Sequence, residues 1–310
     1  MNYSNPLGER AMIKKFEVLP SLIRKNKVLS SKKIYIIQGE VRVLKNVKVT
    51  ASDNVALLLI NGVFKGSCLK RSTLIFDQGS QLSAKKLNFS AADESFKPIK
   101  FADNGGLWFL GNFSDASKDG LSVKMNRKNP LSRFSALLIT ASYLGRKDQY
   151  ISPKSAKLID TGDDIDAISV IGVGHHEWNI DAIKSLYSAD DGIDINNSHI
   201  RLKSLEVKNP TEDGVNLSSS RLEIHGSLIL EVPKTKVMDR DLVDLETDDG
   251  ASYLELYKGS RVKLNGVFGD EVVLSSTDMP KPNTNTDNER VYRFNGRLKK
   301  AALIYSIDQD

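Results

Sequence analysis

Four short motifs that begin with aspartate recur along the middle of this chain. They start at Asp166, Asp191, Asp213 and Asp241, and successive starts are separated by 25, 22 and 28 residues. A motif that recurs at this period is typical of a solenoid, in which each repeat stacks on the one before. The four aspartates are therefore expected to form a column with about 4.8 Å between neighbours, the spacing of paired strands. Such a column is either an active site or a device that holds turns together.

Acid–base catalysis is one chemistry that this column suits. Asp166, Asp190 and Asp191 are the candidate catalytic residues, because neighbouring repeats would bring them together. Inverting hydrolysis of a glycosidic bond needs one carboxylic acid that protonates the leaving oxygen and one carboxylate that activates water. Crowding of like charges raises the pKa of one member of such a pair, which suits that member to donate a proton.

The same region holds further carboxylates that suit ligand or cation binding. Asp194, Glu212 and Asp213 follow the catalytic candidates and are predicted to contact a ligand. Asp163 and Asp164 precede the first motif, and Ca²⁺ requires several oxygen ligands within reach. A dense acidic patch also repels itself unless an ion or shared protons relieve the repulsion. The sequence therefore indicates Asp163 and Asp164 as calcium ligands, and it indicates no other cofactor.

The column also has an interpretation without chemistry. Asp-Gly at the entrance of a strand is a common turn, in which the Asp side chain binds backbone N–H groups and the glycine adopts torsions that other residues avoid. A structural role predicts this turn in every repeat, whereas an active site needs it in two or three. The continuation of the column to Asp241 favours the turn interpretation, and both interpretations stay open.

Alternating apolar residues predict strands along most of the chain. From residue 40 onward β-branched residues alternate with polar ones, beginning with Val41, Val43, Val47 and Val49. This period of two predicts strands, and no convincing helix follows residue 35. A second apolar column recurs at intervals of 22 residues: Ile180, Leu202 and Ile224. Each repeat is thus predicted to contain three short strands, separated by a polar turn, a kink and a longer loop.

With column, turn and strands together, the chain resembles the right-handed parallel β-helix (pectate-lyase-like) superfamily. The similarity is carried by Ser188–Ser198 and Asn209–Leu217, which both contain Asp-Gly before a strand. It is clear over residues 160–265 and extends more weakly to residue 40. The resemblance implies an all-β solenoid of three-strand rungs. We expect a basic N-terminal cap at residues 1–38, a parallel β-helix at 39–277, and an exposed loop with closing strands at 278–310.

A local similarity to the polygalacturonases bears on activity. That family places an Asn-Thr-Asp triplet on one rung and an Asp-Asp pair on the next. Here Asp164-Ile-Asp166 lies where the triplet would be, and Asp190-Asp191 resembles the pair. The resemblance implies that Asp191 is the acid and that Asp166 and Asp190 hold the water. Asp213 stands where that family carries Gly-His-Gly. A calcium-dependent lyase of the same superfamily is the other enzymatic alternative.

Composition and charge restrict the partners. Hydrophobic residues make up 40% of the 310 residues and charged residues 27%, which is typical of a folded protein. The net charge is +5, and basic residues gather near the N-terminus. Nucleic acid thus stays among the partners, although the absence of interleaved aromatic residues favours a solvated face. Neither a secretory signal nor a membrane span is visible, so a cytoplasmic or virion-associated protein is expected.

Three classes of function remain. The main prediction is a β-helix that binds or displays an extended ligand, above all a polysaccharide, with the acidic column on one face. The first alternative is a glycoside hydrolase of polygalacturonase type that acts on an acidic polysaccharide. The second is an intracellular scaffold or nucleic-acid-associated protein. A virion spike segment is one form of the binding class, and it is expected to be a trimeric oligomer.

Overall fold

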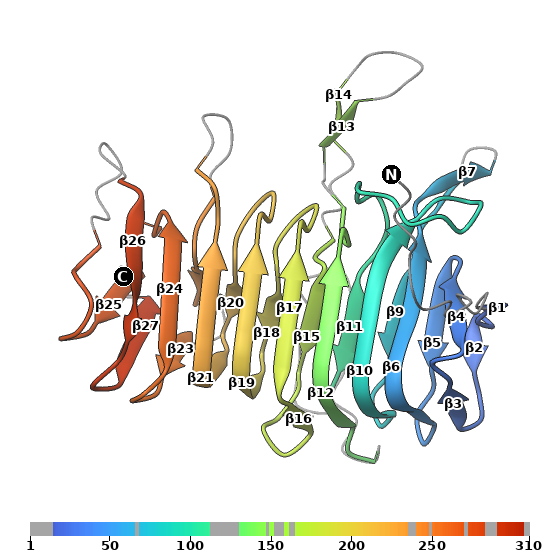
Figure 1. The fold of residues 1–310 in the computed structure, drawn as a ribbon, viewed down its shortest axis with the longest axis horizontal. Coiled ribbons are helices and arrows are strands. Elements are labelled where there is room, and N and C mark those ends of the chain that lie inside the picture. Colours follow the sequence, from blue (N-terminus) through green and yellow to red (C-terminus); the bar gives the residue numbers. More distant parts are fainter. Residues whose placement is uncertain are drawn as a thin grey trace, which may run out of the picture.

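The computed structural model describes residues 15–65, 68–111, 130–146, 149–151, 158–160, 165–234, 240–247, 250–269, 272–282 and 290–306. Within these residues the structure is all-β, and most strand pairs are parallel. Figure 1 shows the strands side by side in chain order, from β1 at one end to β24–β27 at the other. The prediction of an all-β chain with parallel strands is confirmed. The described segments contain no apolar helix of the length that a membrane crossing requires.

The larger sheet has 15 strands within the described residues. Its main path runs through β1 (Lys15–Val18), β4 (Lys33–Ile37), β6 (Lys48–Ile60), β10 (Gln81–Ala92), β12 (Arg133–Ser142), β17 (Ala182–Leu186), β19 (His199–Lys208), β21 (Arg221–Glu231), β23 (Tyr253–Leu256), β27 (Ala302–Ser306) and β25 (Val272–Ser275). The strands that pair beside this path are β3 (Lys27–Leu29), β16 (Trp178–Ile180), β24 (Arg261–Gly266) and β26 (Tyr292–Arg297).

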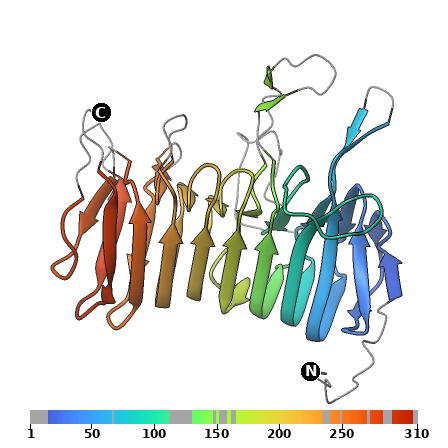
Figure 2. The ribbon, with the colours of Figure 1, turned by 45° about the horizontal axis from the view of Figure 1, so that its top comes forward.

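Within the described residues the smaller sheet has eight strands, which are shorter than most strands of the larger sheet. They run in the order β2 (Leu22–Ile23), β5 (Glu40–Val43), β9 (Thr73–Phe76), β11 (Leu107–Leu110), β15 (Ile168–Ile171), β18 (Asp194–Asn196), β20 (Asn216–Ser218) and β22 (Asp244–Glu246). Two antiparallel hairpins project from one side of the sheets in Figures 1 and 2. They are formed by β7 (Val63–Lys65) with β8 (Cys68–Lys70) and by β13 (Gln149–Ile151) with β14 (Leu158–Asp160).

The chain passes alternately between the two sheets from β18 to β23. Each strand pairs in parallel with the strand one repeat later, so that Ile195, Leu217 and Leu245 are partners on three successive strands. These three side chains are buried in the core that also contains the inward residues of the larger sheet, such as Leu222. The repeats seen in the sequence are therefore neighbours in space.

The kink predicted between two short strands is a bulge inside one long strand. In β19 the register with β21 shifts between Leu202 and Ser204, and β10 shifts against β6 between Ala84 and Lys86. A bulge bends a strand without ending it, because hydrogen bonds to the neighbouring strand continue on both sides. The second and third predicted strands are thus continuous in these repeats.

Tight turns follow three strands of the smaller sheet. Gly172, Asn197 and Ser219 come directly after β15, β18 and β20, and each has a positive φ, of 63°, 45° and 49°. The N–H of Asn197 donates to the Ser218 carbonyl at 2.9 Å, one repeat away. Glycine and asparagine tolerate this left-handed conformation best, which accounts for two of the three residues.

Buried serines support the same turns. The Ser198 hydroxyl accepts from the Val173 N–H at 2.9 Å, the Ser220 hydroxyl accepts from the Ser198 N–H at 2.9 Å, and the Ser252 hydroxyl accepts from the Ser220 N–H at 3.2 Å. Each hydroxyl also donates to a backbone carbonyl of its own repeat. This column of serines satisfies backbone groups that would otherwise be buried without a partner.

Both ends of the described chain add strands to these sheets. Residues 15–37, most of the predicted cap, contain β1–β4, which pair within the two sheets, and residues 1–14 lie outside the described part. Within the predicted closing segment, β26 pairs with β24 and β27 pairs with β23, both antiparallel. The strand direction therefore reverses at the C-terminal end.

Replacement of a buried turn serine should destabilise the fold. In Ser220→Ala the Ser198 N–H loses its acceptor, and we expect the free energy of unfolding to fall by about 1–3 kcal/mol. Urea unfolding measures this value. Ser227→Ala is the matched control, since Ser227 is only half-buried on β21 and should change stability little. Equal stability of the two variants would contradict a role for the serine column.

Candidate functional site

The predicted acidic column lies in the loops that lead into the smaller sheet. The Asp213 N–H donates to Asp191 Oδ1 at 2.7 Å, and the Asp241 N–H donates to Asp213 Oδ1 at 2.6 Å. Each of these carboxylates therefore accepts from the backbone of the next repeat. This is the contact that the turn interpretation of the column predicts.

The glycines after these aspartates serve a different purpose from the one expected. Gly192 and Gly214 are not among the residues with positive φ, so unusual torsions do not explain them. A Cβ on Gly192 would lie 2.2 Å from Val207 Cγ1 and 2.6 Å from the Gly214 carbonyl oxygen. A Cβ on Gly214 would lie 2.6 Å from the Leu242 carbonyl oxygen. Glycine is needed here because the next repeat approaches too closely for a side chain.

Burial and the repulsion between neighbouring carboxyls raise the pKa values of Asp191 and Asp213. Asp190 and Asp191 are only 5% and 6% exposed. Burial, together with the charges of Asp166, Asp213 and Asp190, raises the pKa of Asp191 well above its ordinary value. Burial also raises the pKa of Asp213 to about 8, although the Asp241 N–H opposes the shift. At neutral pH Asp213 therefore tends to stay protonated.

The structure thus brings most of the predicted site residues together. Asp166 and Asp190 lie within electrostatic reach of Asp191, and Glu212 lies within reach of Asp213. Asp194 lies instead on β18, in register with residues of β15 and β20. The catalytic roles of Asp166, Asp190 and Asp191 stay a prediction.

The structure does not describe the two residues predicted to bind calcium. Asp163 and Asp164 lie outside the described residues. In the part of the chain that the structure does describe, no three His, Cys, Asp or Glu side chains are arranged to hold a metal ion.

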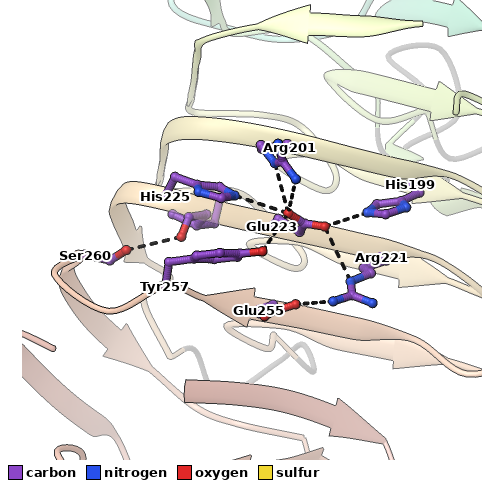
Figure 3. A network of polar contacts seen from close by, with 9 residues as sticks. His199, Arg201, Arg221, Glu223, His225, Glu255, Tyr257 and Ser260 are labelled. Atoms are coloured by element: carbon purple, nitrogen blue, oxygen red, sulfur yellow. Dashed lines mark hydrogen bonds and ion pairs between the residues drawn. The ribbon is translucent and has the colours of Figure 1, made fainter. Parts of the chain in front are cut away.

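A second cluster, centred on Glu223, lies on the outer face of the larger sheet (Figure 3). Arg201, Glu223 and Glu255 are register partners on β19, β21 and β23, and His199, Arg221 and Tyr253 form the adjacent row. Because side chains alternate across a strand, both rows point away from the core, whose residues are their neighbours Leu222 and Leu254. We call these residues, with His225 and Tyr257, the Glu223 cluster.

Glu223 receives contacts from β19, from its own strand β21 and from the residue after β23. His199 Nε2 lies 2.7 Å from Glu223 Oε1, and Arg201 Nε donates to Glu223 Oε2 at 2.9 Å. His225 Nε2 lies 3.2 Å from Glu223 Oε2, and the Tyr257 hydroxyl donates to the same oxygen at 3.1 Å. Both carboxylate oxygens therefore have hydrogen-bond partners, and the surrounding side chains share one anchor.

The anchor is buried, whereas its partners reach solvent. The side chain of Glu223 is 4% exposed, against 59% for Arg201 and 47% for Arg221. Burial alone would raise the pKa of Glu223, but hydrogen bonds from His199, His225, Arg201 and Tyr257 outweigh it and lower the pKa to about 2. Glu223 is therefore a fixed negative charge that orients exposed polar groups.

Two of the four histidines of the chain, His199 and His225, belong to this cluster. The His225 ring stacks on Tyr257 with 3.7 Å between centroids. The His175 ring lies 5.4 Å from His199 and 5.3 Å from His176. No recurring motif marks this cluster in the sequence, although Arg201 and Glu223 are separated by 22 residues, the same interval that separates Asp191 from Asp213.

The raised pKa of Asp213 predicts how stability depends on pH. The pKa of Asp213 is about 8 in the folded chain, against an ordinary 3.8, so its proton stabilises the fold fully below about pH 4. That stabilisation is lost as the pH rises towards 8, by at most about 1.4 kcal/mol per pH unit. Asp213→Asn retains the acceptor oxygen and cannot ionise. Its free energy of unfolding, measured by urea unfolding at several pH values in this window, should therefore change less with pH than that of the wild type.

The exposed Asp53→Asn variant is the control for this experiment and should keep the slope of the wild type. A wild-type slope that survives in Asp213→Asn would show that the proton resides elsewhere.

The lowered pKa of Glu223 predicts the opposite dependence of stability on pH, in a more acidic pH range. Because its folded pKa is about 2, below the ordinary 4.5, its contribution is present above about pH 4.5 and lost as the pH falls towards 2. We expect Glu223→Gln to unfold more easily than wild type at pH 7, by about 1–3 kcal/mol, and the difference to shrink at pH 3. Thermal unfolding at both pH values measures it, with the exposed Glu94→Gln as control. A difference that does not change with pH would contradict the lowered pKa.

No family model matches this chain, and neither a curated protein nor a solved structure matches it. The acidic column and the Glu223 cluster are therefore interpreted from their own geometry and charge.

Proposed function

We propose that this chain is a right-handed parallel β-helix that binds an extended polysaccharide across the outer face of its larger sheet. The β-helix is supported by the alternation of the chain between two parallel sheets and by the pairing of each strand with the strand one repeat later. Repeats that stack in this way produce long, regular surfaces, which such proteins use for extended ligands.

The Glu223 cluster is the observation that carries the binding proposal. Arg201, Arg221 and His199 are exposed and are fixed by contacts to a buried carboxylate. Groups that are already ordered lose little conformational entropy when a ligand binds. Arginine offers a planar fork of donors, and the rings of tyrosine and histidine offer apolar faces with polar edges. These are the groups that suit the hydroxyls and the C–H faces of sugars.

Charge within the cluster favours hydroxyl recognition over the attraction of a polyanion. Arg201 and Arg221 are balanced by Glu223 and Glu255, and the nearby Lys203 pairs with an aspartate at 2.9 Å. At the basic N-terminal end, Lys27 and Lys33 each pair with Glu17 at 2.7 Å. Polysaccharide binding is therefore expected to depend weakly on salt, unlike nucleic-acid binding, which falls steeply with salt.

The length of the face favours a polymer over a small molecule. Exposed polar side chains also occur on the preceding strands of the same sheet, at Arg133 on β12 and Asn179 on β16. Asn179 pairs in register with Ser135, so the polar rows continue from strand to strand. A polymer that contacts several repeats gains avidity from each.

Glycoside hydrolysis at the acidic column is the second candidate, and one observation favours it. A carboxyl that acts as general acid needs a raised pKa, and burial together with the charges of Asp166 and Asp190 raises the pKa of Asp191. Asp191→Asn should abolish any cleavage of an acidic polysaccharide, measured as new reducing ends, and should leave polysaccharide binding at the Glu223 cluster intact.

Arg201→Gln tests the binding proposal. Removal of one exposed guanidinium should weaken binding about tenfold, because a hydrogen bond to a charged group contributes about 1.5–3 kcal/mol. Affinity electrophoresis with neutral and acidic polysaccharides, and with DNA and RNA for comparison, measures the affinity at two salt concentrations. The matched control is Arg24→Gln, which removes an exposed arginine between β2 and β3 at the other end of the stack.

Wild-type chain that binds no polysaccharide, or binds nucleic acid with steep salt dependence, would overturn the proposal. Equal losses in the two arginine variants would show that the Glu223 cluster is not the site.

A further inference from the structure

A hollow of about 350 Å³ opens at one end of the Glu223 cluster, where the parallel strands meet the C-terminal strands, and three members of the cluster line it. Arg221, Tyr253 and Glu255 form one side, and Ser275 with residues 301–303 forms the other. Its volume lies at the lower end of the range that small-molecule sites occupy.

The sheet itself places these two sides next to each other. β27 pairs antiparallel with β23, so Glu255 is the register partner of Leu303, and Leu303 is the partner of Ser275 on β25. The row that contains Arg201, Glu223 and Glu255 thus continues into the C-terminal strands. The exposed Ala301 has a small side chain and leaves the space open.

Charge in the hollow is balanced. Arg221 forms an ion pair with Glu255, and Arg221 Nε lies 3.6 Å from Glu223 Oε1. Arginine carries five N–H groups, so these two contacts do not use all the donors of Arg221. A carboxylate can accept several hydrogen bonds, so Glu255 can accept more than the one from Arg221. An anion entering the hollow would meet two carboxylates, so the site disfavours it.

The remaining walls suit the apolar side of a sugar. Tyr253 is 36% exposed and is the register partner of Arg221, and Leu303 lines the same hollow from β27. Adjacent hydroxyls of a sugar can accept from the guanidinium and donate to the carboxylate, while the C–H face of the ring packs on the tyrosine.

We propose that this hollow is a subsite for one neutral sugar unit with adjacent free hydroxyls. The inference rests on the proposed polysaccharide-binding function, because the hollow continues the face of the Glu223 cluster. The subsite specifies which sugar unit that face binds: a neutral sugar ring with several hydroxyl groups.

Filling the hollow tests the subsite. Ala301→Trp places a large side chain at an exposed position of the wall, outside the Glu223 cluster. Saturation-transfer NMR with glucose, galactose and mannose, and with galacturonate as the charged counterpart, measures binding of single sugars. We expect at least one neutral hexose to bind the wild type more tightly than galacturonate does, and Ala301→Trp to weaken that binding about tenfold or more.

Two further variants keep the test decisive. Tyr253→Ala removes the stacking ring and should weaken hexose binding in the same way. Lys300→Trp adds the same bulk at the exposed neighbouring residue, which does not line the hollow, and should bind like the wild type. Circular dichroism of each variant confirms that it folds.

The outcomes separate the subsite from the proposed function. Wild type that binds no neutral hexose, or hexose binding that survives both Ala301→Trp and Tyr253→Ala, overturns the subsite. If polysaccharide binding then still depends on Arg201, the proposed function stands alone. Hexose binding that Ala301→Trp removes, in a chain that binds no polysaccharide, supports the subsite and overturns the proposed function.

Discussion

The architecture depends on one constraint: each repeat leaves backbone donors and acceptors that the next repeat must satisfy. Paired strands meet this need through their ladders. Turns meet it through side chains, with the Asp191 carboxylate accepting from the next repeat and the Ser220 hydroxyl from the one before. The same residue types recur at the same interval because the same backbone groups recur there. Repeated motifs and buried polar side chains therefore have one common cause.

Two carboxyls, one half-buried and one buried, show how neighbours decide the role of a residue. Asp213 is surrounded by other acids, and its pKa rises to about 8. Glu223 is surrounded by imidazole, guanidinium and phenol groups, and its pKa falls to about 2. The first holds a proton within a turn, whereas the second holds a charge that orders side chains in contact with solvent. Only the second presents organised groups to a ligand, which is why the proposed binding face lies on the larger sheet.

Much of the fold could be predicted from the sequence, because apolar residues such as Ile195 and Leu217 recur at the interval of the repeat. The place of the acidic column followed from the same periodicity. The role of Gly192 did not, since it depends on how closely the carbonyl of Gly214 approaches. The Glu223 cluster was not predicted from the sequence, because Arg201 and Glu223 differ in residue type and so form no recurring motif. Complementary residues at the repeat interval are as informative as identical ones.

The hairpins β7–β8 and β13–β14 project from the same side of the molecule (Figures 1 and 2). Repeat lengths differ along the chain, and the extra residues of β13–β14 leave the register of the flanking strands β12 and β17 intact. The molecule thus separates an edge that absorbs changes in length from a face whose spacing is held constant. Insertions at that edge would enlarge or decorate the protein while the spacing of its polar rows stayed the same.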